Sequence, residues 1–398
     1  MAAAGRHVAL LVVLLALLAA PPAGATTRPT LERWSPGRPG PFLDDFALAP
    51  LDVRTEAPRR RVISLQAWDW PLIDDIKAVN PDALVLVYKS MGSTRTTGDL
   101  VEDGEDARFL PTGVGWVEAD SEHPEWFAIG RDGRRMEWDR WPGFWQMRVE
   151  NRGYQDRWID NVADELGRYG WDGVLMDDLI SDNTAYNDPG PYADDATARA
   201  AMRSFLARVG PAIQARGFLA LANIPAAYSV PGLWADWIQF LDGGAEEHFT
   251  NWSSTTGSGF VWDWGTTGWR AHIEEIVTAE RMGKIAMMKI GGVDGDRAAG
   301  LYGLASYLLA NQGRSIVGWG DTGWLPEFSY RLGTPRGTYR SLGSSVYRRD
   351  FSAGTAIVNA GERSATIRLG GRYLDAGGRV ITEITLGGTR GAVLRAAP

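Results

Sequence analysis

The stretch Trp171–Leu179, WDGVLMDDL, decides the fold that we expect for this chain. Its apolar centre, Val174 to Met176, is typical of a short buried strand, and Asp177 and Asp178 follow where that strand would end. A buried carboxylate without a partner is costly or has a raised pKa, so two in succession indicate a special role. In a parallel α/β barrel, the carboxyl ends of the strands form the mouth that holds the chemistry. The stretch therefore predicts an acidic strand end at such a mouth.

Short apolar segments alternate with amphipathic helical patterns along most of the chain, which predicts an α/β protein. The expected strands lie at residues 61–68, 82–89, 145–150, 171–179, 218–224, 237–247, 284–290 and 315–319. Eight such units predict a (β/α)8 TIM barrel. The alternative is a doubly wound open sheet, but the sequence lacks the glycine-rich phosphate turn that usually follows an early strand of that fold.

Changes in composition and hydropathy pattern along the chain predict four structural segments. Residues 1–25 have the basic start, apolar middle and small-residue exit of a signal peptide, so we expect a secreted protein. Residues 26–59 are expected to form an N-terminal extension, and residues 60–337 the catalytic barrel. Residues 338–398 alternate apolar and polar positions between glycine turns, which predicts a small antiparallel, β-sandwich-like domain. No later apolar run is long enough to span a membrane.

Composition narrows the class of partner. The 398 residues carry a formal net charge of −8 and no basic stripe, which excludes nucleic acid as the expected partner. The chain has no cysteine, so it has no disulfide framework and no thiol nucleophile. Its 18 tryptophans favour a carbohydrate partner, because aromatic faces stack on sugar rings, although tryptophan can also simply fill a large core.

We expect no metal and no cofactor from the sequence. His123, His248 and His272 lack the spacing of a zinc site. The acidic loop at residues 182–188 matches no twelve-residue calcium loop. The Gly-x-Ser-x-Gly turn of a serine hydrolase is also missing.

Carboxylates at two predicted strand ends suit glycosidic bond hydrolysis, which needs one carboxylic acid and one carboxylate. Asp177 ends the fourth predicted strand, and Glu246 and Glu247 end the sixth. Strands four and six lie close together around a barrel mouth, so these groups can flank one bond. Asp177 is preferred over Asp178 because it follows the apolar run directly, whereas the residues alone leave Glu246 and Glu247 as alternatives.

Four segments resemble the hypothetical glycosyl hydrolase-like family 15. They are Tyr88–Gly92, Trp171–Leu179, Asp242–Glu247, and Tyr347–Phe351 with the nearby Val358-Asn359. The resemblance covers residues 60 to 360 and implies a (β/α)8 barrel distantly related to dextranases and polygalactosaminidases.

The resemblance also implies roles at the two acidic strand ends. It implies that Asp177 is the nucleophile and that Glu247, rather than Glu246, is the general acid/base. We therefore expect a secreted glycoside hydrolase that cleaves a poly- or oligosaccharide with retention of configuration. The alternative is a non-catalytic, secreted carbohydrate-binding barrel, in which aromatic residues at strand ends bind sugar without chemistry.

Further strand-end side chains are expected to contact the sugar, because they can stack on its rings or bond its hydroxyls. These predicted substrate-binding residues are Asp178, Trp68, Tyr88, Lys89, Asn223, Lys289, Trp319 and Asp321.

Overall fold

The computed structural model describes residues 28–44, 50–225, 227–253, 255–293 and 295–398. The predicted signal peptide, residues 1–25, lies outside these residues. Within the described part of the chain, no helix is both long and apolar enough to cross a membrane.

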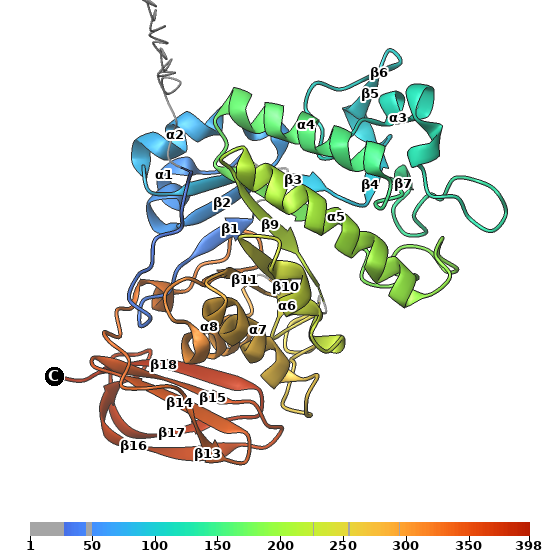
Figure 1. The fold of residues 1–398 in the computed structure, drawn as a ribbon. Coiled ribbons are helices and arrows are strands. Elements are labelled where there is room, and N and C mark those ends of the chain that lie inside the picture. Colours follow the sequence, from blue (N-terminus) through green and yellow to red (C-terminus); the bar gives the residue numbers. More distant parts are fainter. Residues whose placement is uncertain (1–27, 45–49, 226, 254, 294) are drawn as a thin grey trace, which may run out of the picture.

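A parallel eight-stranded barrel forms the main body and confirms the predicted fold (Figure 1). In spatial order its strands are β1 (Phe42–Asp44), β2 (Val62–Leu65), β3 (Leu84–Ser90), β8 (Gly173–Asp177), β9 (Leu219–Asn223), β10 (Gly243–Phe249), β11 (Ile285–Ile290) and β12 (Ile316–Trp319). A parallel bridge between Pro41 and Val317 brings the first and last strands together.

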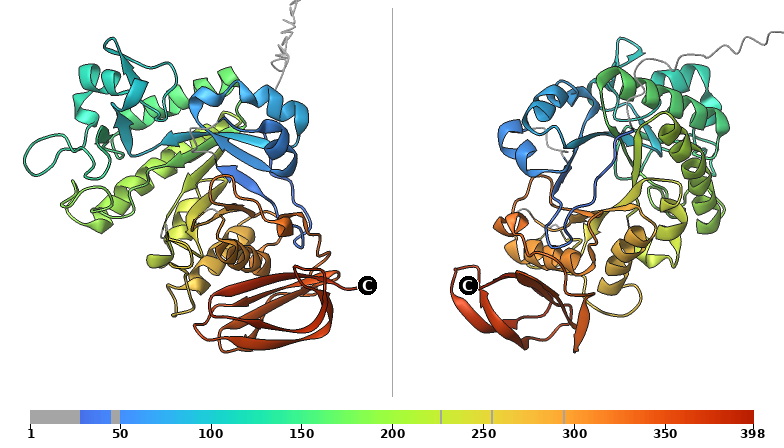
Figure 2. Two further views of the ribbon diagram at one scale, coloured as in Figure 1. Left: turned by 180° about the vertical axis from the view of Figure 1, so that it is seen from behind. Right: turned by 60° about the vertical axis from the view of Figure 1, so that its left-hand side comes forward.

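Helices surround this ring of strands, as the right-hand view of Figure 2 shows. They are α1 (Val53–Glu56), α2 (Leu72–Val79), α4 (Arg152–Tyr169), α5 (Asp195–Ala215), α6 (Leu233–Ile238), α7 (Trp269–Arg281) and α8 (Arg297–Ala310). Helix α4 illustrates how local signals set the bounds: the Asn151 side chain accepts the Tyr154 N–H at its start, and Gly170 ends it with a left-handed φ of 80°.

One predicted barrel strand was wrong, and one barrel strand was missed. The segment predicted at residues 145–150 contributes β7 (Phe144–Gln146), which pairs antiparallel with β4 (Ser93–Arg95) outside the barrel. The strand missing from the prediction is β1, in the segment expected to be an N-terminal extension. The three residues of β1 are too few to show a periodic pattern. The segment of β7 resembles a core strand in sequence because it contains aromatic residues. The errors offset each other, so β8 and β10 are still the fourth and sixth strands.

The strand predicted at residues 237–247 begins later than expected. Residues Leu233–Ile238 form helix α6, and β10 starts only at Gly243. The tryptophans and isoleucine of this helix are buried on one side, and a short helix with such a face resembles a buried strand in sequence.

The connection between β3 and α4 forms a separate lobe beside the barrel (Figure 1). It contains β4, β5 (Val101–Glu102), β6 (Glu105–Asp106), α3 (Trp116–Glu122) and β7. This lobe replaces a simple connection and brings β4 next to the end of β8, since Met91 N–H donates to the Asp177 carbonyl oxygen at 2.8 Å.

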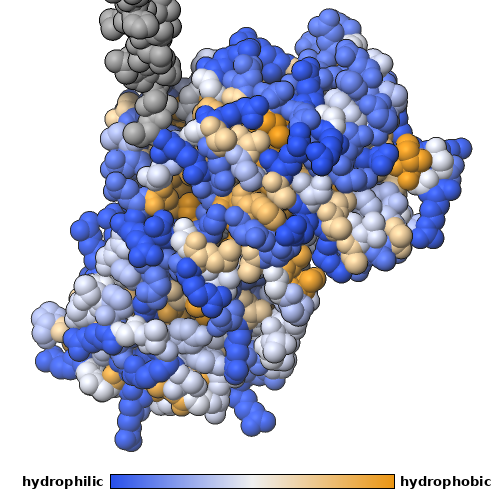
Figure 3. Space-filling view, viewed as in Figure 1, coloured by the Kyte–Doolittle hydropathy of each residue, from blue (hydrophilic) through white to orange (hydrophobic). Residues whose placement is uncertain are grey.

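The C-terminal residues form an antiparallel sheet that packs on α8. Its order is β13 (Arg340–Gly343), β14 (Val346–Phe351), β15 (Gly354–Asn359), β18 (Arg390–Ala396), β16 (Ala365–Leu374) and β17 (Val380–Leu386). The six strands form one sheet, which confirms the predicted small C-terminal antiparallel β domain. A small apolar cluster that includes Ile357 and Leu394 fills its inner side. On the face that Figure 3 shows, the outer parts of the molecule are largely hydrophilic, and apolar residues gather across the middle of the face.

Candidate active site

Strand alternation divides the barrel residues into an inward set and an outward set. The inward set fills the centre as one apolar cluster, with Leu175 on β8, Leu221 on β9, Ala245 on β10 and Met287 on β11. Two residues further along each strand, the same face reaches the mouth. The side chains placed there are Asp44, Tyr88, Asp177, Asn223, Glu247 and Lys289.

Asp177 and Glu247 line the same small pocket at the mouth, on strands separated only by β9. The side chain of Asn223, on β9 itself, donates from Nδ2 to Asp177 Oδ1 at 3.0 Å. Asp44 on β1 and Lys289 on β11, the neighbour of β10, also line the pocket. The two predicted catalytic carboxylates are therefore brought to one place, with an amide between them.

The electrostatic environment keeps Glu247 protonated. Burial, the charge of Asp177 and the charge of Glu246 raise the pKa of Glu247 to about 8, although Lys289 opposes them. At neutral pH this carboxyl group consequently carries the proton that a general acid must donate.

Lys289 supplies the positive charge of the pocket. Its Nζ lies 3.2 Å from Asp44 Oδ2 and 2.8 Å from Asp321 Oδ1. Burial alone would lower the pKa of Lys289, but the two carboxylates outweigh it and raise that pKa. The ammonium group therefore stays charged beside the carboxyl groups of the mouth.

Asp178 turns away from the axis of β8 and meets the lobe between β3 and α4. Its φ of 61° is left-handed, a conformation that Asp adopts more readily than most residues with a side chain. Arg95 of β4 binds Asp178 Oδ2 at 2.8 Å and the Tyr88 hydroxyl at 3.0 Å. Burial and the charge of Asp177 raise the pKa of Asp178, and Arg95 opposes this shift. Asp178 is thus held by an ion pair at the edge of the pocket.

Comparison with known families identifies the chain. The model of hypothetical glycosyl hydrolase family 15 matches residues 77–355. The chain belongs to this family. It is accordingly a glycoside hydrolase, with the barrel that the resemblance implied.

Several solved structures are similar to the chain at low sequence identity. Amy13B of Eubacterium rectale is 9% identical, with a TM-score of 0.51 over 91% of this chain and 94% of its own. Ega3 of Aspergillus fumigatus, in complex with galactosamine, is 14% identical, with a TM-score of 0.44 over 75% and 96%. The glycoside hydrolase domain of PelA from Pseudomonas aeruginosa is 17% identical, with a TM-score of 0.41 over 73% and 96%. No curated protein matches the chain.

Two of the predicted substrate-binding residues of this glycoside hydrolase lie outside the pocket. Lys89 follows the inward Tyr88 and so points outward, where its Nζ binds Glu165 Oε2 of α4 at 2.7 Å. Trp319 is only 5% exposed and packs between the barrel and α8, beside Gly300. Both predictions depend on the position of the residue at the end of a strand. Neighbouring residues of a strand point to opposite faces of the sheet, so an error of one position places a side chain outside the barrel.

Two more predicted residues lie near the mouth without lining the pocket. Trp68 is 44% exposed on the short helix Ala67–Asp69 that follows β2, and Asp321 reaches the pocket only through Lys289. The sequence pattern missed Asp44 and Arg95. The apolar run Pro41–Leu43 before Asp44 was the only signal for the first, and Arg95 had none, because it belongs to the inserted lobe.

Proposed function

We propose that this glycoside hydrolase cleaves a poly- or oligosaccharide with Asp177 as nucleophile and Glu247 as general acid/base. One observation carries the proposal: Asp177 and Glu247 line one pocket at the barrel mouth, and the pKa of Glu247 is raised to about 8. A protonated and an accepting carboxyl group around one bond are what glycoside hydrolysis requires.

The reaction follows from these positions in two steps. Glu247 donates its proton to the glycosidic oxygen while a carboxylate oxygen of Asp177 attacks the anomeric carbon and displaces the leaving sugar. Asn223 holds Asp177 Oδ1 at 3.0 Å, which orients the carboxylate and leaves Oδ2 to attack. Glu247, now a carboxylate, then takes a proton from water as that water breaks the glycosyl–Asp177 bond. Two displacements at the same carbon retain its configuration.

The substrate is proposed to be an extracellular carbohydrate, because residues 1–25 have the pattern of a secretory signal peptide. Mass spectrometry of the exported protein tests this part separately. Export with an N-terminus at Thr26 is expected, and retention of the uncleaved chain in the cytoplasm would contradict it.

The catalytic assignment is tested by release of reducing ends from a panel of polysaccharides. Asp177→Asn and Glu247→Gln are expected to reduce release to a small residual level on every substrate that the wild-type chain cleaves. Asp182→Asn, in the loop after β8 and outside the pocket, is the matched control and keeps full activity. Proton NMR of the first-formed product should show the anomer of the substrate.

Two results would overturn the proposal. Full activity in both variants would remove the carboxylate pair from the chemistry. Saturable sugar binding without turnover, unchanged in Asp177→Asn, would favour the non-catalytic binding barrel instead.

A further inference from the structure

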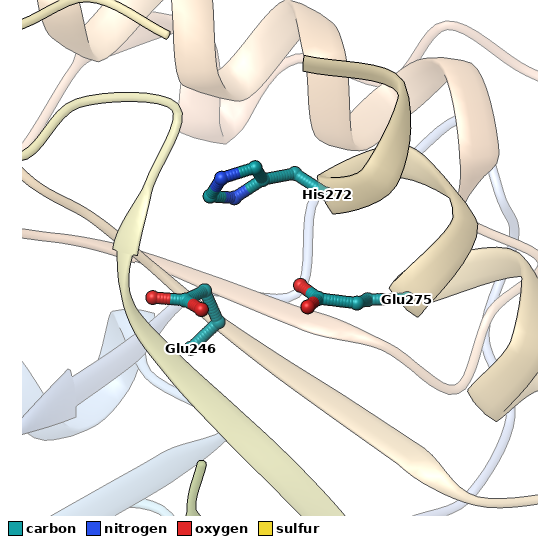
Figure 4. Close-up of side chains that lie close together, drawn as sticks. All are labelled: Glu246, His272 and Glu275. Atoms are coloured by element: carbon teal, nitrogen blue, oxygen red, sulfur yellow. The ribbon is translucent and has the colours of Figure 1, made fainter. Parts of the chain in front are cut away.

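A second cluster of ionisable groups lies behind the active site, on the outward face of β10. Glu246 comes from β10, and His272 and Glu275 come from α7, so that the three side chains converge between strand and helix (Figure 4). Their donor atoms lie within 4.8 Å of one another. Their exposed fractions are 0%, 0% and 4%, which places the whole cluster in the protein interior.

His272 and Glu275 have few polar partners among the described residues. Neither ring nitrogen of His272 has a hydrogen bond there, and Glu275 has no side-chain partner, although the backbone of Tyr228 acts on its carboxyl group. No ion pair of those residues includes His272 or Glu275. Glu246 Oε1 accepts the backbone N–H of His248 at 2.9 Å. Native structures seldom bury so many unpaired polar atoms, so the arrangement points to a missing ligand.

The surroundings leave the imidazole neutral. Burial lowers the pKa of His272 to about 3, so a ring nitrogen offers the lone pair that a metal ligand needs. Burial and the charge of Glu246 raise the pKa of Glu275, so a positive charge between the two carboxylates would relieve their repulsion.

We propose that Glu246, His272 and Glu275 bind one divalent transition-metal ion, with Zn²⁺ as the first candidate. One imidazole and two carboxylates are donors that Zn²⁺ accepts, and its charge offsets both carboxylates. His272 and Glu275 are three positions apart on α7, which puts them on one face of the helix.

The donor atoms of the cluster lie within 4.8 Å of one another. Zinc–ligand bonds of about 2.0–2.2 Å in a tetrahedral site place two donors about 3.4 Å apart. Side-chain movements of about 1 Å would therefore bring the three groups to one ion.

A route for the ion is present. A cavity of about 700 Å³ between α6, α7 and the C-terminal sheet is lined by Glu275, together with Tyr228, Trp234 and Tyr347. The exposed Glu274 lines the same cavity, so it reaches the surface. Water from this cavity can complete the coordination of an ion that has three protein ligands.

The proposed ion would connect the end of β10 to α7 at the residue before Glu247. Glu246 and Glu247 point to opposite faces of the strand, so ligation on one side fixes the backbone that carries the acid on the other. These three residues are therefore proposed as positioning residues for Glu247, in addition to forming a metal site.

The test is a calorimetric titration of the full chain with Zn²⁺ at pH 7.5, after dialysis against a chelator and then against chelator-free buffer. Wild-type protein is expected to bind one equivalent and to gain thermal stability on binding. Glu275→Gln and His272→Gln should weaken the affinity by at least about tenfold. Glu274→Gln, one position away on the exposed side of α7, is the matched control and should bind as the wild type does.

The wild-type titration decides the matter even if a variant folds poorly. Absence of stoichiometric binding, or equal affinity in wild type, Glu275→Gln and His272→Gln, would overturn the proposal. A metal-free Glu275→Gln protein that melts above the metal-loaded wild type would also overturn it, because it would show that a shared proton, and no ion, occupies the space between the carboxyl groups. Parallel titrations with Mn²⁺ and Ca²⁺ identify the ion class, and preference for Ca²⁺ would contradict the imidazole ligand.

Discussion

Strands β8 and β10 each bring two adjacent carboxylates to the barrel mouth, but the second acid of each pair has different surroundings. In both pairs one member faces the pocket: Asp177 on β8 and Glu247 on β10. The other member of the β8 pair, Asp178, meets the guanidinium of Arg95 at 2.8 Å. The other member of the β10 pair, Glu246, lies with a neutral imidazole and a third carboxyl group.

The difference lies in the charge beside the second acid: Asp178 has a guanidinium within hydrogen-bond distance, whereas Glu246 is grouped with a further carboxyl group. The lobe after β3 carries Arg95 to Asp178, so that pair is complete within the protein. At β10, the outward acid Glu246 lies beside Glu275 and His272 of α7. No ion pair among the described residues includes Glu275 or His272.

The largest effect is expected within the β8 pair. Asp177→Asn should lower kcat/KM by about 10⁴-fold, because the attacking oxygen is lost, while the melting temperature stays near that of the wild type. Steady-state kinetics and calorimetric melting of the same preparations measure both. Asp178→Asn is the comparison variant. It should lower the melting temperature more than Asp177→Asn does and lower kcat/KM less. Similar kinetic losses in both variants would mean that the two acids share the chemistry.

Removing the counter-charge on β8 should cost stability. Arg95→Ala leaves Asp178 buried without its cation and is expected to lower the free energy of unfolding by about 3–5 kcal/mol. Urea denaturation followed by tryptophan fluorescence measures this change. Arg140→Ala, at an exposed position of the same lobe, is the control and should stay close to the wild type. A loss no larger than that of the control would show that the ion pair is unimportant.

The acid on β10 predicts a pH limit. Because the pKa of Glu247 is raised to about 8, the proton is present below that pH and is lost as the pH rises through it. We expect kcat/KM to fall about tenfold per pH unit above pH 8. The residual activity of Glu247→Gln should lack this decline. The same shift means that the folded state binds this proton more tightly than the unfolded chain, so the contribution of Glu247 to stability also decreases as the pH rises toward 8.

The smallest effect concerns the cation of the pocket. Lys289 lowers the pKa of Glu247, so Lys289→Met should move the alkaline limit of kcat/KM to higher pH. Lys284→Met, just before the other end of β11, provides the control and should leave the limit in place. A limit that moves to lower pH in Lys289→Met would contradict the electrostatic role of this lysine.

Most of the barrel could be predicted because its longer strands have clear apolar runs between helical patterns. The strand β1 could not, since three residues carry no periodic signal, and β7 resembles a core strand because it is aromatic. The register of the site was only partly predictable. Asp177, Asn223 and Glu247 lie on the inward face, whereas Lys89 and Trp319 fall on the outward one, which position at a strand end does not distinguish.

Groups of residues that come from separate elements could not be predicted from the sequence for a different reason. The spacing of the histidines does not reveal the cluster around His272, because its other two members are glutamates and one of them lies on another element. Arg95 comes from a lobe whose position depends on tertiary packing. Such groupings depend on contacts between distant segments, which a linear pattern does not encode.

The pairing of Asp44 with Lys289 bears on how the protein is made. These residues are 245 positions apart, and β1 also needs β12 to complete its second edge. During synthesis, β1 leaves the ribosome early. Its second neighbour, β12, is made only after the other barrel strands. Contacts of such long range form slowly. The charges of the pocket are therefore balanced late, and a nascent chain that stops before β11 holds Asp44 without Lys289.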